Sequence, residues 1–217
     1  IVNGMSAGGA TISYTLPTGC VATGFVVVNP LPGSITGTAE ICMGSSTIFT
    51  NPTPFGTWSS NNTSIATVGS TSGEVTAVSP GIVTISYTLL ATGCYITKQV
   101  TVNPVPPSIS GTPFMCVGGS TFLSNPLTGG TWSSGDPLVA TIDAFGNVVS
   151  TGTGTTTITY TLTSACYITQ LVTVEPTLNP IVGGTNVCAG STTPFTNTYV
   201  GGIWSSSNAG VATVGTS

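Results

Sequence analysis

The sequence predicts an all-β protein composed of tandem seven-stranded β-sandwiches, and three observations support this prediction. The same phrases return at intervals of 74 and 72 residues, so the chain contains an internal repeat. Apolar residues alternate with Thr and Ser over short segments, as they do in half-buried strands. Clusters of Gly, Pro, Asn and Ser interrupt these segments, as turns do. Together these features favour several small domains in series.

Tryptophan and cysteine mark the repeat. The pentapeptide GTWSS occurs twice and GIWSS once, and these contain the three tryptophans, Trp58, Trp132 and Trp204. Two sets of cysteines keep the same intervals as the tryptophans. The sets are Cys20, Cys94 and Cys166, and Cys42, Cys116 and Cys188.

The phrases VVVNP, VTVNP and VTVEP close each repeat, so the boundaries fall after residues 30, 104 and 176. Residues 31–104 and 105–176 are therefore predicted to be complete repeats. Residues 1–30 correspond to the last part of a repeat, and residues 177–217 to the first part. We expect either that the chain is a window from a longer array or that its ends complete each other between copies.

Turn clusters divide the first complete repeat into seven segments with strand periodicity. The clusters include CMGSS, NPTPFG, SSNNTS, GSTSG, SPG and ATG. The strands expected between them are, in order, about 34–41, 46–50, 56–60, 65–68, 74–78, 82–89 and 94–102. Seven short strands in about 70 residues suit a small β-sandwich.

The last two predicted strands show the alternation most clearly. IVTISYTL (82–89) places Val83, Ile85 and Tyr87 on one face and hydroxyl side chains on the other. CYITKQVTV (94–102) has the same pattern, but Lys98 interrupts its apolar face. A bulge or an open edge of the sandwich would accommodate that lysine.

Each repeat is expected to centre on one buried tryptophan. A repeat this small has few large side chains, and one indole supplies about 150–250 Å² of apolar area. The alternative is an exposed tryptophan that grips a sugar ring, but GTWSS has no neighbouring aromatic residue. The predicted core positions are Trp58, Trp132, Trp204, Tyr14, Tyr87 and Tyr160.

The shortage of charge excludes several classes of partner. Only 3% of the residues are charged, the chain has one Lys and no Arg or His, and its formal net charge is −4. One lysine cannot neutralise nucleic-acid phosphates or an anionic membrane surface. Apolar runs fall far short of the roughly 20 residues that cross a bilayer. A surface with so little like-charge repulsion favours association with copies of itself or with further repeats.

No constellation typical of catalysis or of a metal site is present. Without His, acid–base chemistry would depend on two carboxylates, and the only close pair, Asp136 and Asp143, has no counterpart in the other repeats. We expect these residues to be ordinary turn aspartates. Cysteines this far apart do not predict a zinc site, and no loop has the carboxylates that calcium needs. We therefore expect no catalytic residue, no cofactor and no metal.

The stretch TWSSNNTSIATVGSTSGEVTAVSPGIVTISYT (57–88) resembles the group 2 bacterial immunoglobulin-like domain. The matching pattern is Trp-Ser-Ser-Asn, then Ala-Thr-Val, then a Gly-Val-Thr strand and Gly-x-x-Thr-Ile; residues 131–161 and 203–214 carry it too. The resemblance implies an immunoglobulin-like sandwich used in tandem in bacterial surface proteins, including the stalks of invasin- and intimin-like adhesins. It offers no catalytic residue to carry over.

Two disulfide patterns are open. Six cysteines in a Thr-rich, Lys-poor chain predict an oxidising, extracellular setting. The resemblance to the bacterial Ig-like domain implies that this setting is a bacterial cell surface. One pattern bridges within repeats, Cys42–Cys94 and Cys116–Cys166. If the strands alternate up and down, however, the two cysteines of a repeat lie at opposite poles, which favours Cys42–Cys166 across repeats. The remaining cysteines would then pair with neighbouring copies, Cys116 with Cys20 and Cys188 with Cys94.

The sequence therefore predicts a structural repeat module of a long extracellular fibre, stalk or filament that self-assembles head to tail. The alternative is an adhesin whose loops at the two ends of the sandwiches bind a glycan or a host protein. Overlapping Asn-glycosylation sequons in NNTS (61–64) do not separate these functions. Because few groups titrate near neutrality, stability should vary little between about pH 5 and 9.

Overall fold

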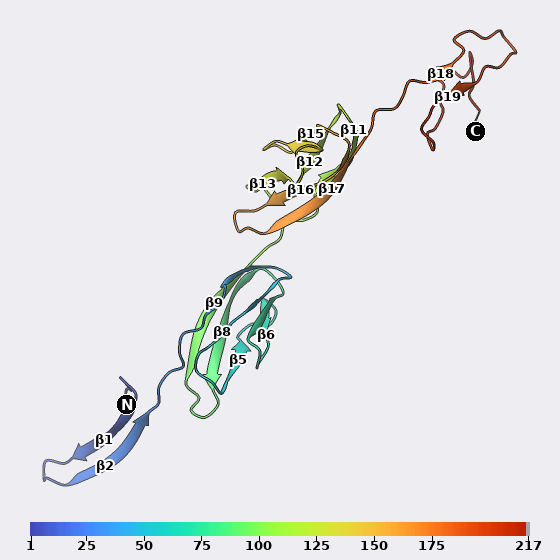
Figure 1. Ribbon diagram of the computed structural model, residues 1–217. Helices are drawn as coiled ribbons and strands as arrows, with labels where there is room; N and C mark the ends of the chain where they lie inside the picture. Colours follow the sequence, from blue (N-terminus) through green and yellow to red (C-terminus); the bar gives the residue numbers. More distant parts are fainter. Residues whose placement is uncertain (216–217) are drawn as a thin grey trace. The chain divides into compact units, whose positions relative to one another are not determined.

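The computed structural model describes residues 1–215, and every regular element in that part of the chain is a β-strand. The predicted all-β class is therefore confirmed. The strands follow one another in groups along the chain, as the colours of Figure 1 show. No helix between residues 1 and 215 has the length and apolar character needed to cross a membrane.

The first group of strands is a hairpin. Strands β1 (Gly8–Thr15) and β2 (Val21–Val28) pair in antiparallel fashion over their whole length. They form a two-stranded sheet, which no other strand of the described residues joins. The predicted core position of Tyr14 is wrong for this hairpin, because its side chain is 71% exposed. The reason is that no second layer covers it.

The first complete repeat folds as two sheets. One sheet has the order β3-β9-β8-β5 and the other the order β4-β7-β6. These orders are those of an immunoglobulin sandwich, in which the third, sixth and seventh strands share one sheet. The strands are β3 (Glu40–Cys42), β4 (Ser46–Ile48), β5 (Gly56–Ser60), β6 (Ala66–Val68), β7 (Glu74–Ala77), β8 (Gly81–Leu89) and β9 (Tyr95–Asn103).

The first predicted strand, 34–41, is divided between the two sheets. Thr36 pairs with Thr50 in an antiparallel bridge beside the β4 sheet. Gly37 then adopts a φ of 122°, which residues other than glycine rarely adopt, and the chain crosses to the other sheet. There β3 runs parallel to β9. The prediction of one continuous strand was wrong because it did not anticipate this crossing.

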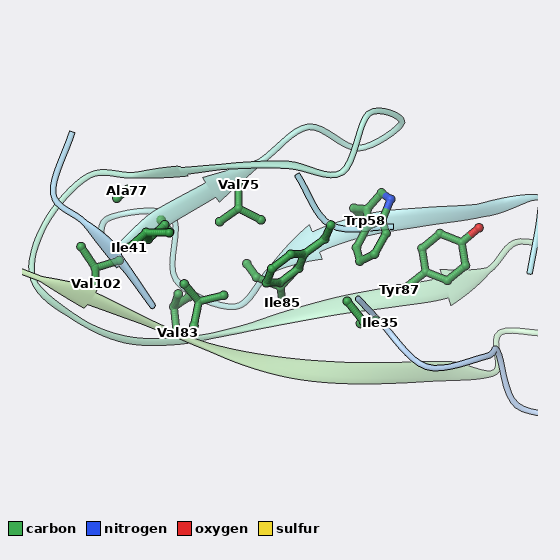
Figure 2. Packing of buried hydrophobic residues seen from close by; sticks show 12 residues of the cluster. Ile35, Ile41, Trp58, Val75, Ala77, Val83, Ile85, Tyr87 and Val102 are labelled. Carbon is green, nitrogen blue, oxygen red and sulfur yellow. The ribbon is translucent and has the colours of Figure 1, made fainter. Parts of the chain in front are cut away.

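A single apolar core lies between the two sheets of the first repeat. Trp58 and Tyr87 are each 6% exposed, and their ring centroids lie 4.7 Å apart. The ring centroid of Phe49, the residue directly after β4, lies 6.2 Å from that of the same indole. Figure 2 shows Val75 and Ala77 from one sheet facing Val83, Ile85 and Val102 from the other.

The second complete repeat has the same arrangement. Its sheets have the orders β10-β12-β15-β14 and β11-β17-β16-β13. Tyr160 is buried as expected, whereas Trp132 is half-buried rather than fully enclosed. The strands are β10 (Ser110–Gly111), β11 (Phe114–Cys116), β12 (Ser120–Ser124), β13 (Thr131–Ser134), β14 (Ala140–Ile142), β15 (Asn147–Ser150), β16 (Gly154–Thr161) and β17 (Tyr167–Glu175).

The last group of strands is short. Strands β18 (Val182–Gly183) and β19 (Phe195–Thr196) pair in antiparallel fashion. Trp204 follows them outside any strand and is only half-buried, so its predicted core position is not realised. The cause is the same as at Tyr14: the described residues after 176 include no counterpart of the β8–β9 layer that covers Trp58.

Candidate functional site: cysteines at the two ends of the sandwiches

The two cysteines of the first repeat lie at opposite ends of β9. Cys42 ends β3 and stands opposite Asn103, the last residue of β9, in the parallel pairing. Cys94 directly precedes Tyr95, the first residue of β9. A nine-residue strand spans about 25–30 Å, whereas a disulfide needs Cα atoms within about 7 Å. A Cys42–Cys94 bridge is therefore impossible in this fold.

The second repeat has the same geometry. Cys116 ends β11 and stands opposite Glu175, the last residue of β17. Cys166 directly precedes Tyr167, where β17 begins. A Cys116–Cys166 bridge is excluded for the same reason.

Cys42 and Cys166 form a disulfide that joins consecutive repeats. Their Cα atoms lie 5.7 Å apart, and 124 positions separate them in sequence. Cys166 is fully buried. The segment 159–169, which contains Cys166, groups in space with residues 1–109, so both sulfurs belong to one compact unit of the chain. Of the two patterns left open by the sequence, the structure contains the cross-repeat one.

A tight turn fixes the cysteine at the end of β3. The Cys42 carbonyl accepts hydrogen bonds from the Ser45 backbone N–H at 3.0 Å and from the Ser45 hydroxyl at 2.6 Å. Gly44 adopts a φ of 84°, which closes the turn. The Cys116 carbonyl accepts the corresponding bond from Gly119 at 2.9 Å. Both cysteines of this set are therefore held by the same local geometry.

The hairpin turn before β9 fixes the other set. The Cys94 carbonyl accepts a bond from Leu89 N–H at 2.9 Å, and the Cys166 carbonyl accepts one from Leu162 N–H at 2.8 Å. These bonds close the turns between β8 and β9 and between β16 and β17. Each sandwich therefore presents one cysteine of each set, at opposite ends of its last strand.

Four cysteines carry no disulfide within the part of the chain that the structure describes. Cys94 is half-buried, and the other three are exposed. They are Cys20, Cys94, Cys116 and Cys188.

A tyrosine hydroxyl ties the loop before the tryptophan strand to β8. The Tyr87 hydroxyl donates to the Thr53 carbonyl at 2.6 Å and accepts from the Gly56 N–H at 3.0 Å. In the second repeat Tyr160 makes the same pair of bonds, to Leu127 and from Gly130. The sequence placed both tyrosines in the core but did not reveal the roles of their hydroxyls.

Two segments of the chain match families of known domains. Residues 46–95 match the bacterial Ig-like domain (group 2), and residues 125–165 match the intimin immunoglobulin-like domain. Each match falls within one of the two complete sandwiches, whose strand orders are those of the immunoglobulin fold.

The chain contains tandem bacterial immunoglobulin-like domains.

Several individual proteins resemble these Ig-like domains. Ice-binding protein 1 of Shewanella frigidimarina is 31% identical over 208 residues, which cover 80% of this chain and 23% of that protein. The chain thus spans about a quarter of the length of that relative. A solved fragment of intimin, in complex with the intimin-binding domain of its translocated receptor, is 17% identical over 67% of this chain and 64% of its own, with a TM-score of 0.46. Invasin, described as a bacterial integrin-binding protein, is 16% identical over 78% of this chain and 46% of its own, with a TM-score of 0.42.

The side chain of Lys98 on β9 lies at the open edge of the first Ig-like domain and contacts residues 35–37. Its ammonium donates to the Gly37 carbonyl at 2.7 Å and to the Ile35 carbonyl at 3.4 Å, and lies 5.2 Å from the centre of the Phe49 ring. The register of β8 and β9 continues unbroken through this residue, opposite Ile85. Of the two sequence-based explanations, the structure therefore shows the open edge and no bulge.

The two aspartates of the second Ig-like domain support turns. Asp136 accepts a bond from Leu138 N–H at 3.0 Å. Asp143 accepts bonds from the side chain and backbone of Asn147 and from Phe145 N–H. These bonds, with that of the Asn147 side chain the largest effect, lower the pKa of the exposed Asp143 carboxyl below its ordinary value of 3.8.

Proposed function

We propose that this chain is a structural repeat module of a long extracellular fibre, stalk or filament on a bacterial surface. One observation carries the proposal: a disulfide joins the first Ig-like domain to the second through Cys42 and Cys166. A bridge inside one domain would stabilise that domain alone. A bridge between domains ties the end of one to the next, which serves a chain that must carry tension.

The surface and composition support the same role. Only Lys98 offers trypsin a cleavage site in 217 residues, and only 3% of the residues are charged. Disulfides persist in oxidising compartments, which supports an extracellular location. With no His in the chain, we propose that this module has no catalytic activity.

Gold-labelled antibodies raised against the 217-residue chain test this proposal on whole cells of the source bacterium. Label should follow fibres or stalks that extend from the cell surface, and pretreatment with a membrane-impermeant reductant should shorten or break them. Label confined to the cell interior would overturn the proposal.

A second candidate is surface binding through the polar outer face of the first Ig-like domain. Ser86 and Thr88 of β8 stand beside Ser59 and Thr57 of β5 in the antiparallel register, on the face opposite the core. Rows of hydroxyls on neighbouring strands can hydrogen-bond to sugar hydroxyls or to ordered water. One relative is named as an ice-binding protein, and one matching family is that of the intimin domain.

Binding assays separate this candidate from the structural role. The 217-residue chain and a Ser86→Lys/Thr88→Lys variant are compared on a glycan array, on host cells and in an ice-recrystallisation assay. Saturable binding or inhibition that the variant loses would favour surface binding. Equal, non-saturable signals for both proteins would favour the structural role.

A further inference from the structure

The first strand of the second Ig-like domain covers only the end of β17. Strand β11 pairs with β17 at residues 173–175. The strand before it, β10, lies in the opposite sheet, where it pairs with β12. Between residues 1 and 215, therefore, no strand pairs with residues 167–171 on the side of β17 that faces away from β16. This stretch of β17 is an open sheet edge.

Alternation along the backbone determines which groups face the open edge. The Thr173 N–H donates to the Pro113 carbonyl at 2.9 Å, on the side of β11. Residues two apart along a paired strand direct their N–H and C=O groups to the same side. Three residues of the open stretch therefore present both backbone groups to the edge, with no strand partner in the described chain. They are Tyr167, Thr169 and Leu171.

The side chains beside this edge are uncharged, and two of them are large and exposed. Tyr167 and Leu171 are 60% and 57% exposed. They lie on the same face as Thr169, because side chains alternate between the two faces of a strand. The Gln170 side chain donates to the Leu171 carbonyl at 3.1 Å, but a carbonyl oxygen can accept a second hydrogen bond. The edge can therefore still pair with a further strand.

The first Ig-like domain has the same open edge, but a charge protects it. Strand β3 pairs with β9 at residues 101–103, which leaves residues 95–99 without a strand on that side. The Lys98 ammonium lies at this edge and donates to the Gly37 carbonyl at 2.7 Å. A neutral strand that docked there would bury the ammonium without an anionic partner, which is costly. An inward-pointing charge of this kind keeps open edges from pairing.

The second domain lacks that protection. Aligned on the cysteine before the last strand, Gln170 stands at the place of Lys98, and Leu171 at the place of Gln99. Both replacements make the edge of β17 less polar than that of β9. The segment YITQLV (167–172) also combines β-branched and aromatic residues with an absence of charge, as strands that pair with other chains do.

We propose that residues 167–171 pair in antiparallel fashion with the same residues of a second copy of this chain. The pairing is centred on Thr169, because that register gives a partner to every free backbone group of the stretch. Tyr167 then stands opposite the partner's Leu171, and Thr169 opposite the partner's Thr169. The result is a continuous sheet through the second Ig-like domains of two copies.

The edge fits a second copy of itself. A two-fold antiparallel pair uses the same patch on both copies, so the partner must offer free groups at the same spacing, which β17 does. Each exposed Tyr167 ring meets a leucine across the strands, and aromatic–aliphatic cross-strand pairs stabilise sheets. Only 3% of the residues are charged, so repulsion between copies is weak.

The contact is short, so the association should be weak and reversible. Stable protein–protein interfaces bury roughly 1,200–2,000 Å² in total, which a pair of five-residue strands does not approach. We therefore expect a dimer that forms at high protein concentration and that a chemical trap can capture. In an extended fibre this pairing would join neighbouring fibres laterally, which goes beyond the proposed structural role and does not depend on it.

A cysteine placed at the centre of the pair traps the dimer. The starting protein is the 217-residue chain in which the four cysteines outside the Cys42–Cys166 disulfide are replaced by serine. In it, Thr169→Cys places two thiols on residues directly opposite each other, about 5.5 Å apart at Cα, within the range of disulfides. Oxidised glutathione converts the two thiols to a disulfide and is itself reduced to two thiols. A denaturing gel without reductant should show a dimer that increases with protein concentration.

Matched variants test the selectivity of the edge. Thr97→Cys, at the equivalent place in the first domain, should give no dimer. Addition of Gln170→Lys to the Thr169→Cys protein should abolish its dimer, and addition of Lys98→Gln to the Thr97→Cys protein should create one. Circular dichroism confirms that each variant is folded.

Sedimentation equilibrium tests the pairing without a trap. In the starting protein the mean mass should rise with concentration. Thr169→Pro removes a backbone N–H that faces the open edge and should abolish this rise. Thr97→Pro removes the equivalent N–H of the first domain and should leave the rise unchanged.

Three results would overturn the inference. They are a Thr169→Cys protein that stays monomeric at every concentration, equal dimer yields with and without Gln170→Lys, and a rise in mean mass that survives Thr169→Pro. None of them bears on the proposed fibre role, which the cell-labelling experiment tests separately.

Discussion

Removal of the Cys42–Cys166 disulfide should have a large and calculable mechanical effect. When the chain is pulled from its two ends, the disulfide prevents extension of the residues between the two cysteines. An extended chain gains at most 3.3–3.6 Å per residue, so a loop of 124 positions hides about 400–450 Å of contour length. The Cys42→Ser variant should release that length.

The same substitution should lower stability. Closing a loop of 124 positions restricts the unfolded chain by about 5 kcal/mol in the chain-entropy treatment. This effect applies in full when both domains unfold together and is smaller when they unfold one at a time. Urea unfolding of Cys42→Ser should therefore show a lower midpoint than that of the wild-type chain.

Single-molecule force spectroscopy on monomeric chains measures the released length directly. Cys116→Ser is the matched control, because Cys116 has the equivalent position in the second domain but no disulfide in the single chain. Oxidised wild type and Cys116→Ser should show the short contour length, and Cys42→Ser and reduced wild type the long one. Equal contour lengths for oxidised and reduced wild type would refute the reasoning.

Three further predictions concern the core and the pH dependence. Tyr87→Phe leaves the Thr53 carbonyl and the Gly56 N–H without their hydroxyl partner and should lower the free energy of unfolding, measured in urea, by about 1–3 kcal/mol. The control Tyr95→Phe alters a side chain on β9 that is 60% exposed and should change the free energy of unfolding by less than about 0.5 kcal/mol. Equal effects of the two substitutions would contradict the role of the Tyr87 hydroxyl. Trp58→Ala should cost about 3–5 kcal/mol, and Trp204→Ala much less in the monomeric chain; a mild effect at Trp58 would argue against a core built on that ring. Folding lowers the pKa of Asp143, so this carboxylate stabilises the folded state above the unfolded pKa near 3.8, and the stabilisation is lost as the pH falls through the lower folded pKa. The melting temperature should therefore be constant from about pH 5 to 9. A marked fall in melting temperature within that window would contradict this account.

The period of the sequence was sufficient to predict the strands of the first complete repeat after the first one. Val83, Ile85 and Tyr87 alternate with hydroxyl residues, and the structure buries all three. The first strand was harder to predict, because its change of sheet depends on a positive φ at Gly37. A glycine in a Thr-rich segment does not by itself indicate that conformation.

Alignment of the repeats predicted some core positions wrongly. Tyr14 and Tyr87 lie in the same phrase, ISYT, and both were therefore predicted to be buried. Burial, however, depends on the layer opposite, and that layer is supplied by residues distant in sequence for Tyr87 and by nothing in the described chain for Tyr14. Local pattern specifies which face is apolar but does not specify what covers it.

The cysteine geometry could be inferred because it depends on strand direction rather than on detailed packing. Up-and-down strand order placed Cys42 and Cys94 at opposite poles, and the parallel pairing of β3 with β9 gives the same separation. The hydrogen bonds from Lys98 to the carbonyls of Ile35 and Gly37 could not be inferred, because they require the observed crossing of the first strand.

The single lysine allows one direct measurement of the cross-repeat link. Trypsin divides the chain after Lys98 into residues 1–98 and 99–217. The Cys20→Ser/Cys188→Ser variant serves best, because it keeps only the four cysteines that take part in the two disulfide patterns of the single chain. The oxidised variant is alkylated, denatured, digested with trypsin and run on a gel without reductant.

If Cys42 is joined to Cys166, the two tryptic fragments stay together and separate only when reductant is added. If the bridges lie within domains, Cys42–Cys94 and Cys116–Cys166, the fragments separate without reductant, and the account of a chain linked from repeat to repeat is wrong.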